Sequence, residues 1–265
     1  MSAKSRFFWH DLMVNDVEKA KAFYGELFGW SFKTDKGAPP YTHIMSGEHG
    51  VGGMMSLKDL EGGAHVPPHW LGYVNVDDLD AVTKAVAAAH GKVLSPKESV
   101  PEVGEWAVIA DPTGGALAPM VYRGRDAGRP ESNEMPRPGE FCWDELWSSD
   151  SDAAWKFYSA VFGWDHEGME MPGWGTYHLL KRTGVKDAKG ADKNAGGITR
   201  LQPGMPQSYW LSYIATGDTD QTAARAAKLG AQTLAPPMDI PEVGRFAVFM
   251  DPQQATFAVL APPKK

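Results

Sequence analysis

The chain has 265 residues, of which 43% are hydrophobic and 22% charged, proportions that exclude disordered and fibrous proteins. Its formal net charge of -7 argues against nucleic acid and anionic membranes as partners, because both bind cationic surfaces. A lone cysteine, Cys142, excludes an internal disulfide framework, and no apolar run approaches the roughly 20 residues that cross a bilayer. We therefore expect a cytoplasmic protein.

The first predicted elements are a strand and a helix. Phe7–Val14 alternates and is rich in strand-forming residues. Asn15 is the expected N-cap of the helix, with Glu18 three residues on in capping-box spacing, and Gly29 ends the helix. One apolar helical face is formed by Ala20, Phe23, Tyr24, Leu27 and Phe28.

A second strand–helix unit follows two short strands around Tyr41–Met45 and Val51–Leu57. It is predicted to consist of the strand Trp70–Val76, a helix from Leu79 to His90, and the strands Trp106–Ala110 and Ala116–Tyr122. A tight turn at Asp111–Gly114 separates the last two strands.

The second half of the sequence repeats the first. Tyr24 and Trp30 recur as Tyr158 and Trp164, each 134 residues later. Towards the end of each copy, the motifs Pro-Glu-Val-Gly and Asp-Pro recur 140 residues apart. The six extra residues fall mainly in the polar stretch Lys181–Lys193, which is predicted to be a longer loop. Such a repeat indicates a tandem duplication.

The stretch Arg123–Gly139 is dense in Pro, Gly and charge, which is typical of a linker. We therefore predict a first domain over residues 1–123, a linker over 124–139 and a second domain over 140–265. Each copy is expected to contain two βαβββ units, so the fold class is α+β with four such units in the chain.

Two motifs resemble those of the vicinal oxygen chelate superfamily, which includes glyoxalases, bleomycin-resistance proteins and extradiol dioxygenases. One is the pattern L-x-V-x-D-x-x-x-A-x-x-FY-x-x-x-FG-W over Leu12–Trp30, and the other is the D-P-x-G turn before the last strand of a domain. The resemblance implies two half-open β-barrel domains, each with a concave face that holds a ligand. Because members include both metal enzymes and metal-free binding proteins, the fold does not name a reaction.

The resemblance also implies where a metal would be bound. The corresponding positions are Trp9, Leu71 and Ala118 in the first copy and Trp143, Leu211 and Ala258 in the second. None of these side chains is a metal ligand, so no metal and no other cofactor is predicted. The alternative is a lyase, isomerase or dioxygenase with one divalent metal at a displaced site, in one domain only if the site is formed in the first copy by His43 and His69.

Strand alternation places Trp9, Asp11 and Met13 on the concave face of the first copy, and Trp143, Glu145 and Trp147 on that of the second. Asp11 and Glu145 either orient a ligand or act as a base, or they are structural hydrogen-bond acceptors. These two carboxylates are the candidate catalytic residues.

The predicted ligand-binding residues are completed by side chains of the second unit of each copy: His69, Tyr73, Tyr209 and Tyr213. An aromatic lining favours flat or apolar ligands. We expect a protein that binds a small apolar or aromatic molecule in one pocket per domain, as a monomer or homodimer. Trp30, Trp70 and Trp164 are expected in the core, and Cys142 is expected to be an inert thiol.

Overall fold

The structure is a computed structural model that describes residues 5–124, 136–171, 175–202, 205 and 207–263. Most of the predicted linker, residues 125–135, lies outside the described residues. The four α-helices are α1 (Val17–Phe28), α2 (Leu79–Ala88), α3 (Ser151–Phe162) and α4 (Thr219–Lys228). None of the helices among the described residues is long and apolar enough to cross a membrane.

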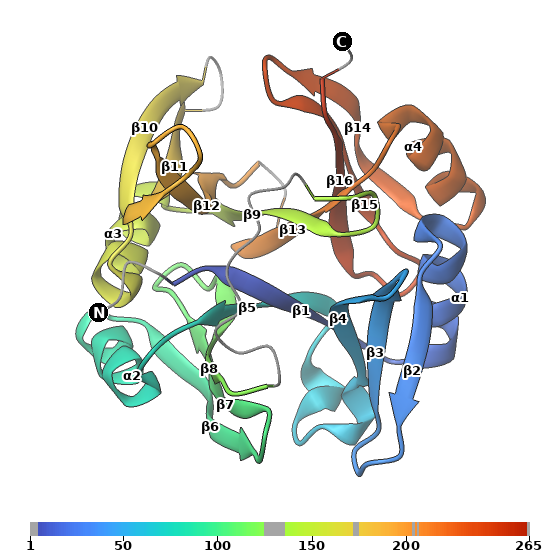
Figure 1. Cartoon of the computed structure of the whole chain (residues 1–265), viewed down its shortest axis with the longest axis horizontal. Helices are drawn as coiled ribbons and strands as arrows, with labels where there is room; N and C mark the ends of the chain where they lie inside the picture. The colour runs from blue at the N-terminus through green and yellow to red at the C-terminus, as the bar shows by residue number, and fades with distance from the viewer. Residues whose placement is uncertain (1–4, 125–135, 172–174, 203–204, 206, 264–265) are drawn as a thin grey trace. The chain divides into compact units, whose positions relative to one another are not determined.

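Strands make up most of the remaining chain (Figure 1). Those of the first repeat are β1 (Phe7–Val14), β2 (Ser31–Asp35), β3 (Tyr41–Ser46), β4 (His49–Ser56), β5 (His69–Asn75), β6 (Lys92–Val100), β7 (Gly104–Ala110) and β8 (Ala116–Tyr122). Those of the second are β9 (Phe141–Ser148), β10 (Asp165–Met171), β11 (Gly175–Lys186), β12 (Asp192–Arg200), β13 (Tyr209–Ala215), β14 (Gln232–Ile240), β15 (Gly244–Met250) and β16 (Thr256–Ala261).

Each repeat forms one open, mixed sheet of eight strands. The strand orders are β2-β3-β4-β1-β5-β8-β7-β6 and β10-β11-β12-β9-β13-β16-β15-β14. Within each βαβββ unit the first strand pairs in parallel with the last, as β1 does with β4 and β5 with β8, and the remaining pairs are antiparallel. The predicted α+β class with four βαβββ units is confirmed.

Two local expectations were wrong. The N-cap of α1 is Asp16, whose side chain accepts a hydrogen bond from the Lys19 N–H, and not Asn15. Either residue type caps a helix well, so composition alone did not distinguish them. The stretch Lys181–Lys193 is also not a loop, because β11 continues to Lys186 and pairs with Asp192 at the start of β12. Apart from Arg182, which is buried, its polar residues are partly or fully exposed on this hairpin.

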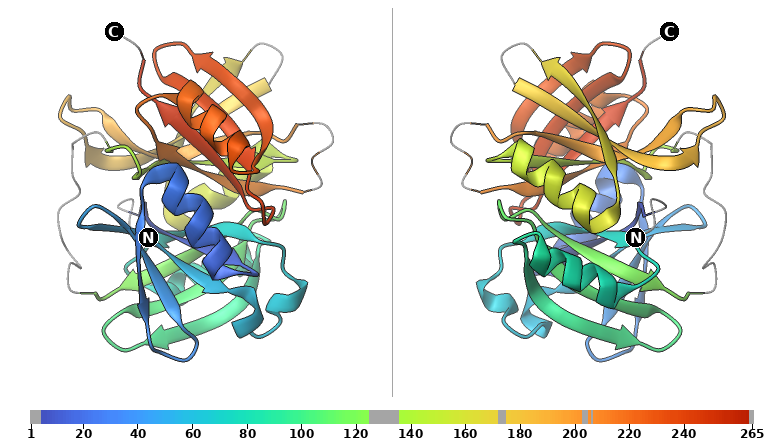
Figure 2. Two further views of the ribbon diagram at one scale, coloured as in Figure 1. Left: turned by 90° about the vertical axis from the view of Figure 1, so that its right-hand side faces the viewer. Right: turned by 90° about the vertical axis from the view of Figure 1, so that its left-hand side faces the viewer.

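The chain divides into two compact units that do not follow the repeat. The first unit lies within the described parts of Met1–Phe8, Gly72–Glu134 and Asp144–Trp210. The second lies within those of Trp9–Leu71, Met135–Trp143 and Leu211–Lys265. Each unit therefore combines a βαβββ unit from one half with one from the other, and the domain boundaries drawn from the repeat stay a prediction. Helices α2 and α3 lie side by side in the first unit, as α1 and α4 do in the second (Figure 2).

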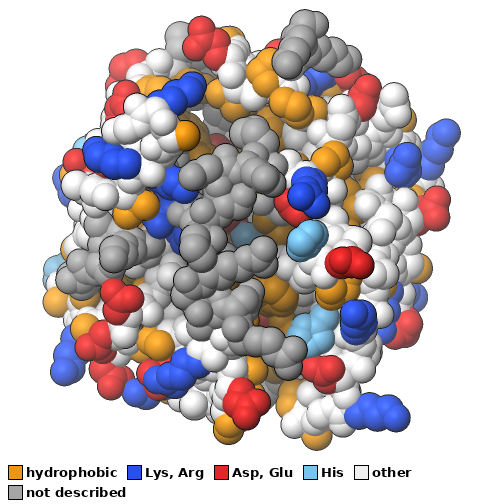
Figure 3. Space-filling model, in the orientation of Figure 1, with side chains coloured by type: hydrophobic (Ala, Val, Ile, Leu, Met, Phe, Trp, Pro, Cys, Tyr) orange, Lys and Arg blue, Asp and Glu red, His pale blue; other side chains and the backbone are white. Residues whose placement is uncertain are grey.

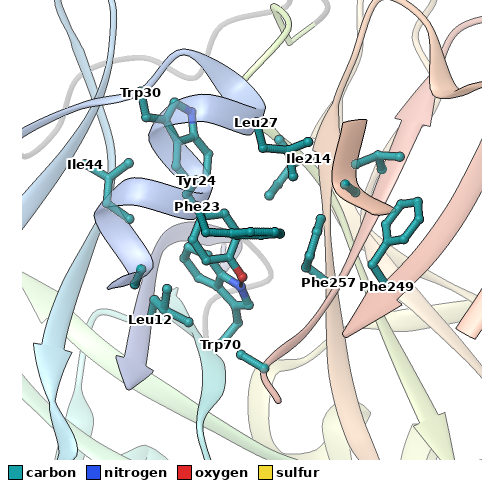
Figure 4. Close-up of a cluster of buried hydrophobic side chains, with 14 of the residues drawn as sticks. Leu12, Phe23, Tyr24, Leu27, Trp30, Ile44, Trp70, Ile214, Phe249 and Phe257 are labelled. Atoms are coloured by element: carbon teal, nitrogen blue, oxygen red, sulfur yellow. Dashed lines mark hydrogen bonds between the residues drawn. The ribbon is translucent and has the colours of Figure 1, made fainter. Parts of the chain in front are cut away.

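The core of the second unit lies between α1 and the sheet strands (Figure 4). Residues from both halves of the sequence contribute to it: Leu12, Phe23, Tyr24, Leu27, Trp30, Ile44, Trp70, Ile214, Phe249 and Phe257. The first unit has a matching core that includes Leu146, Phe157, Tyr158, Phe162, Trp164 and Trp210. The expectation that Trp30, Trp70 and Trp164 are core residues is confirmed, because each is at least 96% buried.

Inside each core, a tryptophan, a tyrosine and an aspartate form a hydrogen-bonded chain. In the second unit, Trp70 Nε1 donates to the Tyr24 hydroxyl, which donates to Asp251 Oδ2 at 2.9 Å. The first unit repeats this chain with Trp210, Tyr158 and Asp111. The aspartate is that of the repeated Asp-Pro turn, so the two motifs that carried the family resemblance meet in space. Each Trp–Tyr–Asp hydrogen-bond network joins a helix of one half of the sequence to a turn of the other half.

Candidate functional site

The first-repeat site is centred on Asp11 in the middle of β1. This carboxylate is only 4% exposed. Its Oδ1 accepts hydrogen bonds from Trp9 Nε1 at 2.9 Å and from the Tyr41 hydroxyl at 2.7 Å, and the same indole N–H also points at the hydroxyl, 2.8 Å away. Leu12, the next residue, packs into the helix-side core, so Asp11 faces the opposite side of the sheet.

A glycine beside Asp11 is required by this arrangement. Gly53 on β4 is paired with Asp11 in the strand register. A Cβ atom at Gly53 would overlap the Tyr41 hydroxyl and approach Asp11 Oδ1. The repeated Gly-Gly of this strand therefore marks a close approach, as expected for glycine within a sheet, and the tyrosine hydroxyl occupies the space that a side chain would take.

The second-repeat site is centred on Glu145 in β9. Trp147 Nε1 donates to Glu145 Oε1 at 2.6 Å. Gly197 is paired with Glu145, and a Cβ atom there would overlap the hydroxyl of Tyr177, just as at Gly53 in the first repeat. The two repeats thus share a carboxylate, an indole donor, a glycine and a nearby tyrosine.

Tyr209, the first residue of β13, completes the second-repeat site. The centroid of its ring lies 6.1 Å from that of Trp147. Its hydroxyl is buried and has no hydrogen-bond partner among the described residues. Burial and the negative charge of Glu145 raise the pKa of Tyr209, so the phenol keeps its proton.

The equivalent residue of the first repeat is His69. Its Nδ1 lies 2.8 Å from the backbone oxygen of Pro67, and burial lowers the pKa of the imidazole. A neutral ring therefore donates from Nδ1 to that oxygen. The two sites differ at this position: one has a histidine bonded to the backbone, and the other has a phenol without a hydrogen-bond partner among the described residues.

The sequence profile of the "Glyoxalase/Bleomycin resistance protein/Dioxygenase superfamily" matches residues 6–118, and that of a "Glyoxalase-like domain" matches residues 140–260. The chain belongs to this superfamily. The expected resemblance is therefore confirmed over both repeats.

Named relatives of this family align over nearly the whole chain. The "Putative glyoxylase CFP32" of Mycobacterium tuberculosis is 37% identical over 96% of this chain and 94% of its own length. The "Anthracycline biosynthesis protein DnrV" of Streptomyces peucetius is 32% identical over 95% of this chain and 91% of its own.

Solved structures of the family share the fold at low identity. The Mn(II)-bound glyoxalase from Novosphingobium aromaticivorans superimposes with a TM-score of 0.64 at 16% identity, covering 98% of this chain and 84% of that one. The 2,3-dioxygenase LapB from Pseudomonas sp. KL28 gives a TM-score of 0.60 at 14% identity, covering 98% and 92%.

The family's metal does not fit the side chains at the positions expected to hold it. Leu71, Ala118, Leu211 and Ala258 are buried and carry no lone pair. The Trp9 indole is a donor and is already bonded to Asp11. Within the described segments, no three His, Cys, Asp or Glu side chains converge so as to hold a metal ion.

The displaced alternative would use His43 and His69, which have separate partners. His43 Nε2 lies 2.9 Å from Asp35 Oδ2, while His69 is tied to Pro67. Cys142 is half-buried, and its thiol donates to the backbone oxygen of Tyr213.

Some predicted ligand-binding residues are brought together and others are not. Trp9 bonds Asp11, and Trp147 bonds Glu145 and lies near Tyr209. Of the remaining candidates, Met13 belongs to the same compact unit as Asp11, whereas Tyr73, Trp143 and Tyr213 belong to the unit that does not contain the carboxylate of their repeat. The ring of Tyr213 packs against that of Phe246. Their role in binding stays a prediction.

Sequence reasoning missed Tyr41 and Tyr177. Both are aromatic residues near the start of the strand before the Gly-Gly strand, and this recurrence between the copies was an available signal.

Two surface grooves of about 400 and 350 Å³ lie elsewhere, over the start of α1 and beside Arg137, and include none of the site residues. On the face in Figure 3, side chains of both charges are interspersed and form no large patch of one sign.

Proposed function

We propose that this chain binds a small apolar or aromatic molecule at the carboxylate site of each repeat, without a metal ion. The observation that carries the proposal is the buried Asp11 carboxylate, held in place by Trp9 and Tyr41 on the sheet face opposite the helix. A carboxylate fixed between aromatic side chains accepts a ligand's hydroxyl or N–H, while the rings pack against its flat surface.

The named relatives support an aromatic ligand class. DnrV is named for anthracycline biosynthesis, and anthracyclines are flat, fused-ring compounds. CFP32 is named as a glyoxylase, which keeps an enzymatic role as the second candidate for this chain. In that role Asp11 and Glu145 would act as acid–base groups, because the metal positions carry Trp, Leu and Ala.

The proposal is tested by metal analysis and ligand titration of the whole chain. Protein purified without chelator is expected to contain well under one divalent metal ion per repeat. Anthraquinone is expected to quench tryptophan fluorescence saturably, since indole groups flank each site, and Asp11→Asn and Glu145→Gln should weaken binding of hydroxylated derivatives.

Asp35→Asn, which changes an exposed carboxylate beside His43 in the same way, serves as the control and should leave binding unchanged. One tightly held metal ion per repeat, or the absence of saturable quenching, would contradict the proposal. Turnover that disappears in Asp11→Asn or Glu145→Gln with the fold retained would establish the enzymatic role instead.

A further inference from the structure

Tyr209 carries a buried hydroxyl at the second-repeat site. Buried polar groups in folded proteins are almost always hydrogen-bonded, and a phenol both donates and accepts. The Tyr209 hydroxyl nevertheless has no partner among the described residues. An unpaired buried hydroxyl destabilises the free protein, so its presence at a candidate binding site indicates a partner that arrives with the ligand.

The groups around this hydroxyl define what that partner is. Tyr209 lies against the ring of Trp147, whose indole N–H donates to Glu145. Leu146 and Trp210, the neighbours of these residues along their strands, point into the helix-side core. The phenol, the indole and the carboxylate therefore share the opposite face of the sheet.

Tyr209 and Glu145 offer a ligand complementary hydrogen-bonding groups, one a donor and the other an acceptor. Burial and the charge of Glu145 raise the pKa of Tyr209, so its hydroxyl remains a donor across the physiological range. Glu145 is a carboxylate and therefore an acceptor, and one of its oxygens takes the Trp147 indole N–H. A ligand that satisfies both groups presents one acceptor and one donor on the same edge of a flat ring system.

We propose that the second-repeat site recognises planar aromatic compounds with a carbonyl and a hydroxyl group on one edge, such as hydroxyquinones. The Tyr209 hydroxyl donates to the carbonyl, Glu145 accepts from the hydroxyl, and Trp147 packs against the rings. This inference rests on the proposed binding function and adds its ligand class.

The first repeat has no tyrosine at the position of Tyr209. The residue at the position of Tyr209 is His69, whose Nδ1 is bonded to the backbone oxygen of Pro67, so it offers no hydroxyl donor to a ligand carbonyl. Recognition of a carbonyl and a hydroxyl together therefore belongs to the second repeat.

The test compares three ligands on the full chain by calorimetric titration: 1-hydroxyanthraquinone, its methyl ether and anthracene. Tyr209→Phe is expected to lower affinity for the hydroxyquinone about tenfold, the effect of losing one buried hydrogen bond, and to leave anthracene unchanged. Glu145→Gln keeps an acceptor for Trp147 but removes the charge, so it should reduce the preference for the hydroxyquinone over its ether. Repeating the titrations with Asp11→Asn isolates the second-repeat site.

Tyr122→Phe makes the same chemical change on the other sheet and is the matched control. Thermal unfolding of free Tyr209→Phe separates a binding role from a structural one, because removing an unpaired hydroxyl should leave Tm unchanged or raise it. A lowered Tm with unchanged hydroxyquinone affinity overturns the inference.

Equal affinity of the wild-type chain for all three compounds, unaffected by Tyr209→Phe, overturns the ligand class but leaves the binding function standing. Failure to bind any of the three compounds overturns both.

Discussion

Tyr24 shows how much one residue contributes to this fold. Its ring packs in the core of the second unit, and its hydroxyl lies between the Trp70 indole and the Asp251 carboxylate. The apolar stripe of the helix predicted that Tyr24 is buried. It did not predict the hydroxyl's partner, because Asp251 is 227 residues away and only the fold brings them together.

The pH dependence of stability should report on Asp251. Burial raises the pKa of this carboxyl above 3.8 in the folded chain, although its hydrogen bonds from Tyr24 and the backbone act in the opposite direction. The folded protein therefore holds the proton more tightly than the unfolded chain does. The resulting stabilisation is fully present below pH 3.8 and is lost as the pH rises through the folded pKa.

Comparison with Asp251→Asn isolates this effect, because asparagine does not titrate. The free energy of unfolding of the wild type relative to Asp251→Asn is expected to be largest in acid and to decline towards neutral pH. Urea unfolding of both proteins at several pH values measures it. A difference that grows as the pH rises would show instead that the folded state favours the ionised carboxylate.

At the candidate site, the sequence predicted the residues of one strand but not those that cross to another. Strand alternation placed Trp9 with Asp11 and Glu145 with Trp147, and both pairs are hydrogen-bonded. Tyr41 escaped prediction because its contact with Asp11 depends on the register between strands, which the alternation within a single strand does not define.

Among the elements, the exposed edge strands were the hardest to locate. The βαβββ pattern requires a strand directly after each helix, but the positions of β2 and β6 were not assigned from the sequence. Most of their residues are exposed, so they lack the alternation that marked Phe7–Val14. Pro96 within β6 is typical of an edge strand, where no partner needs the missing N–H.

The turn between β6 and β7 and the equivalent turn between β14 and β15 each contain one strained residue. Glu102 and Glu242 adopt φ values of 64° and 63°, in the left-handed region that favours glycine and asparagine. Holding an ordinary side chain there costs about 1 kcal/mol. Glu102→Asn is therefore expected to stabilise the chain by a few tenths to about 1 kcal/mol, measured by urea unfolding.

Glu98→Asn is the control for this change. Glu98 is also exposed but lies in the extended strand β6, where asparagine is disfavoured, so no gain is expected. Equal effects of the two substitutions would mean that the strain at Glu102 is not relieved by asparagine.

For the whole molecule, the repeat predicted the number of βαβββ units but not how they associate. The domain boundaries drawn from the repeat stay a prediction, and each compact unit draws on both halves. The reason is that each helix completes its core with residues of the other half, as α1 does with Phe249 and Phe257. A periodic pattern indicates which face of a helix is buried but not which element covers it.

Cutting the chain between the repeats should therefore leave the halves associated. A protease site inserted within residues 125–135 is expected, after cleavage, to give a complex that elutes from size-exclusion chromatography at the volume of the intact chain. The same site placed in the turn between β6 and β7 provides a cleavage control within one half. Halves that separate without denaturant would contradict the shared cores.

The reciprocal tyrosine–aspartate bonds constrain how such a gene can evolve. Recombination between the two repeats could excise one of them as easily as duplication created it. The surviving copy would then bury Tyr24 or Tyr158 without its aspartate, unless a second molecule supplied one. Shrinkage to a single repeat would therefore select for self-association, whereas the tandem chain carries both halves of each bond wherever it is expressed.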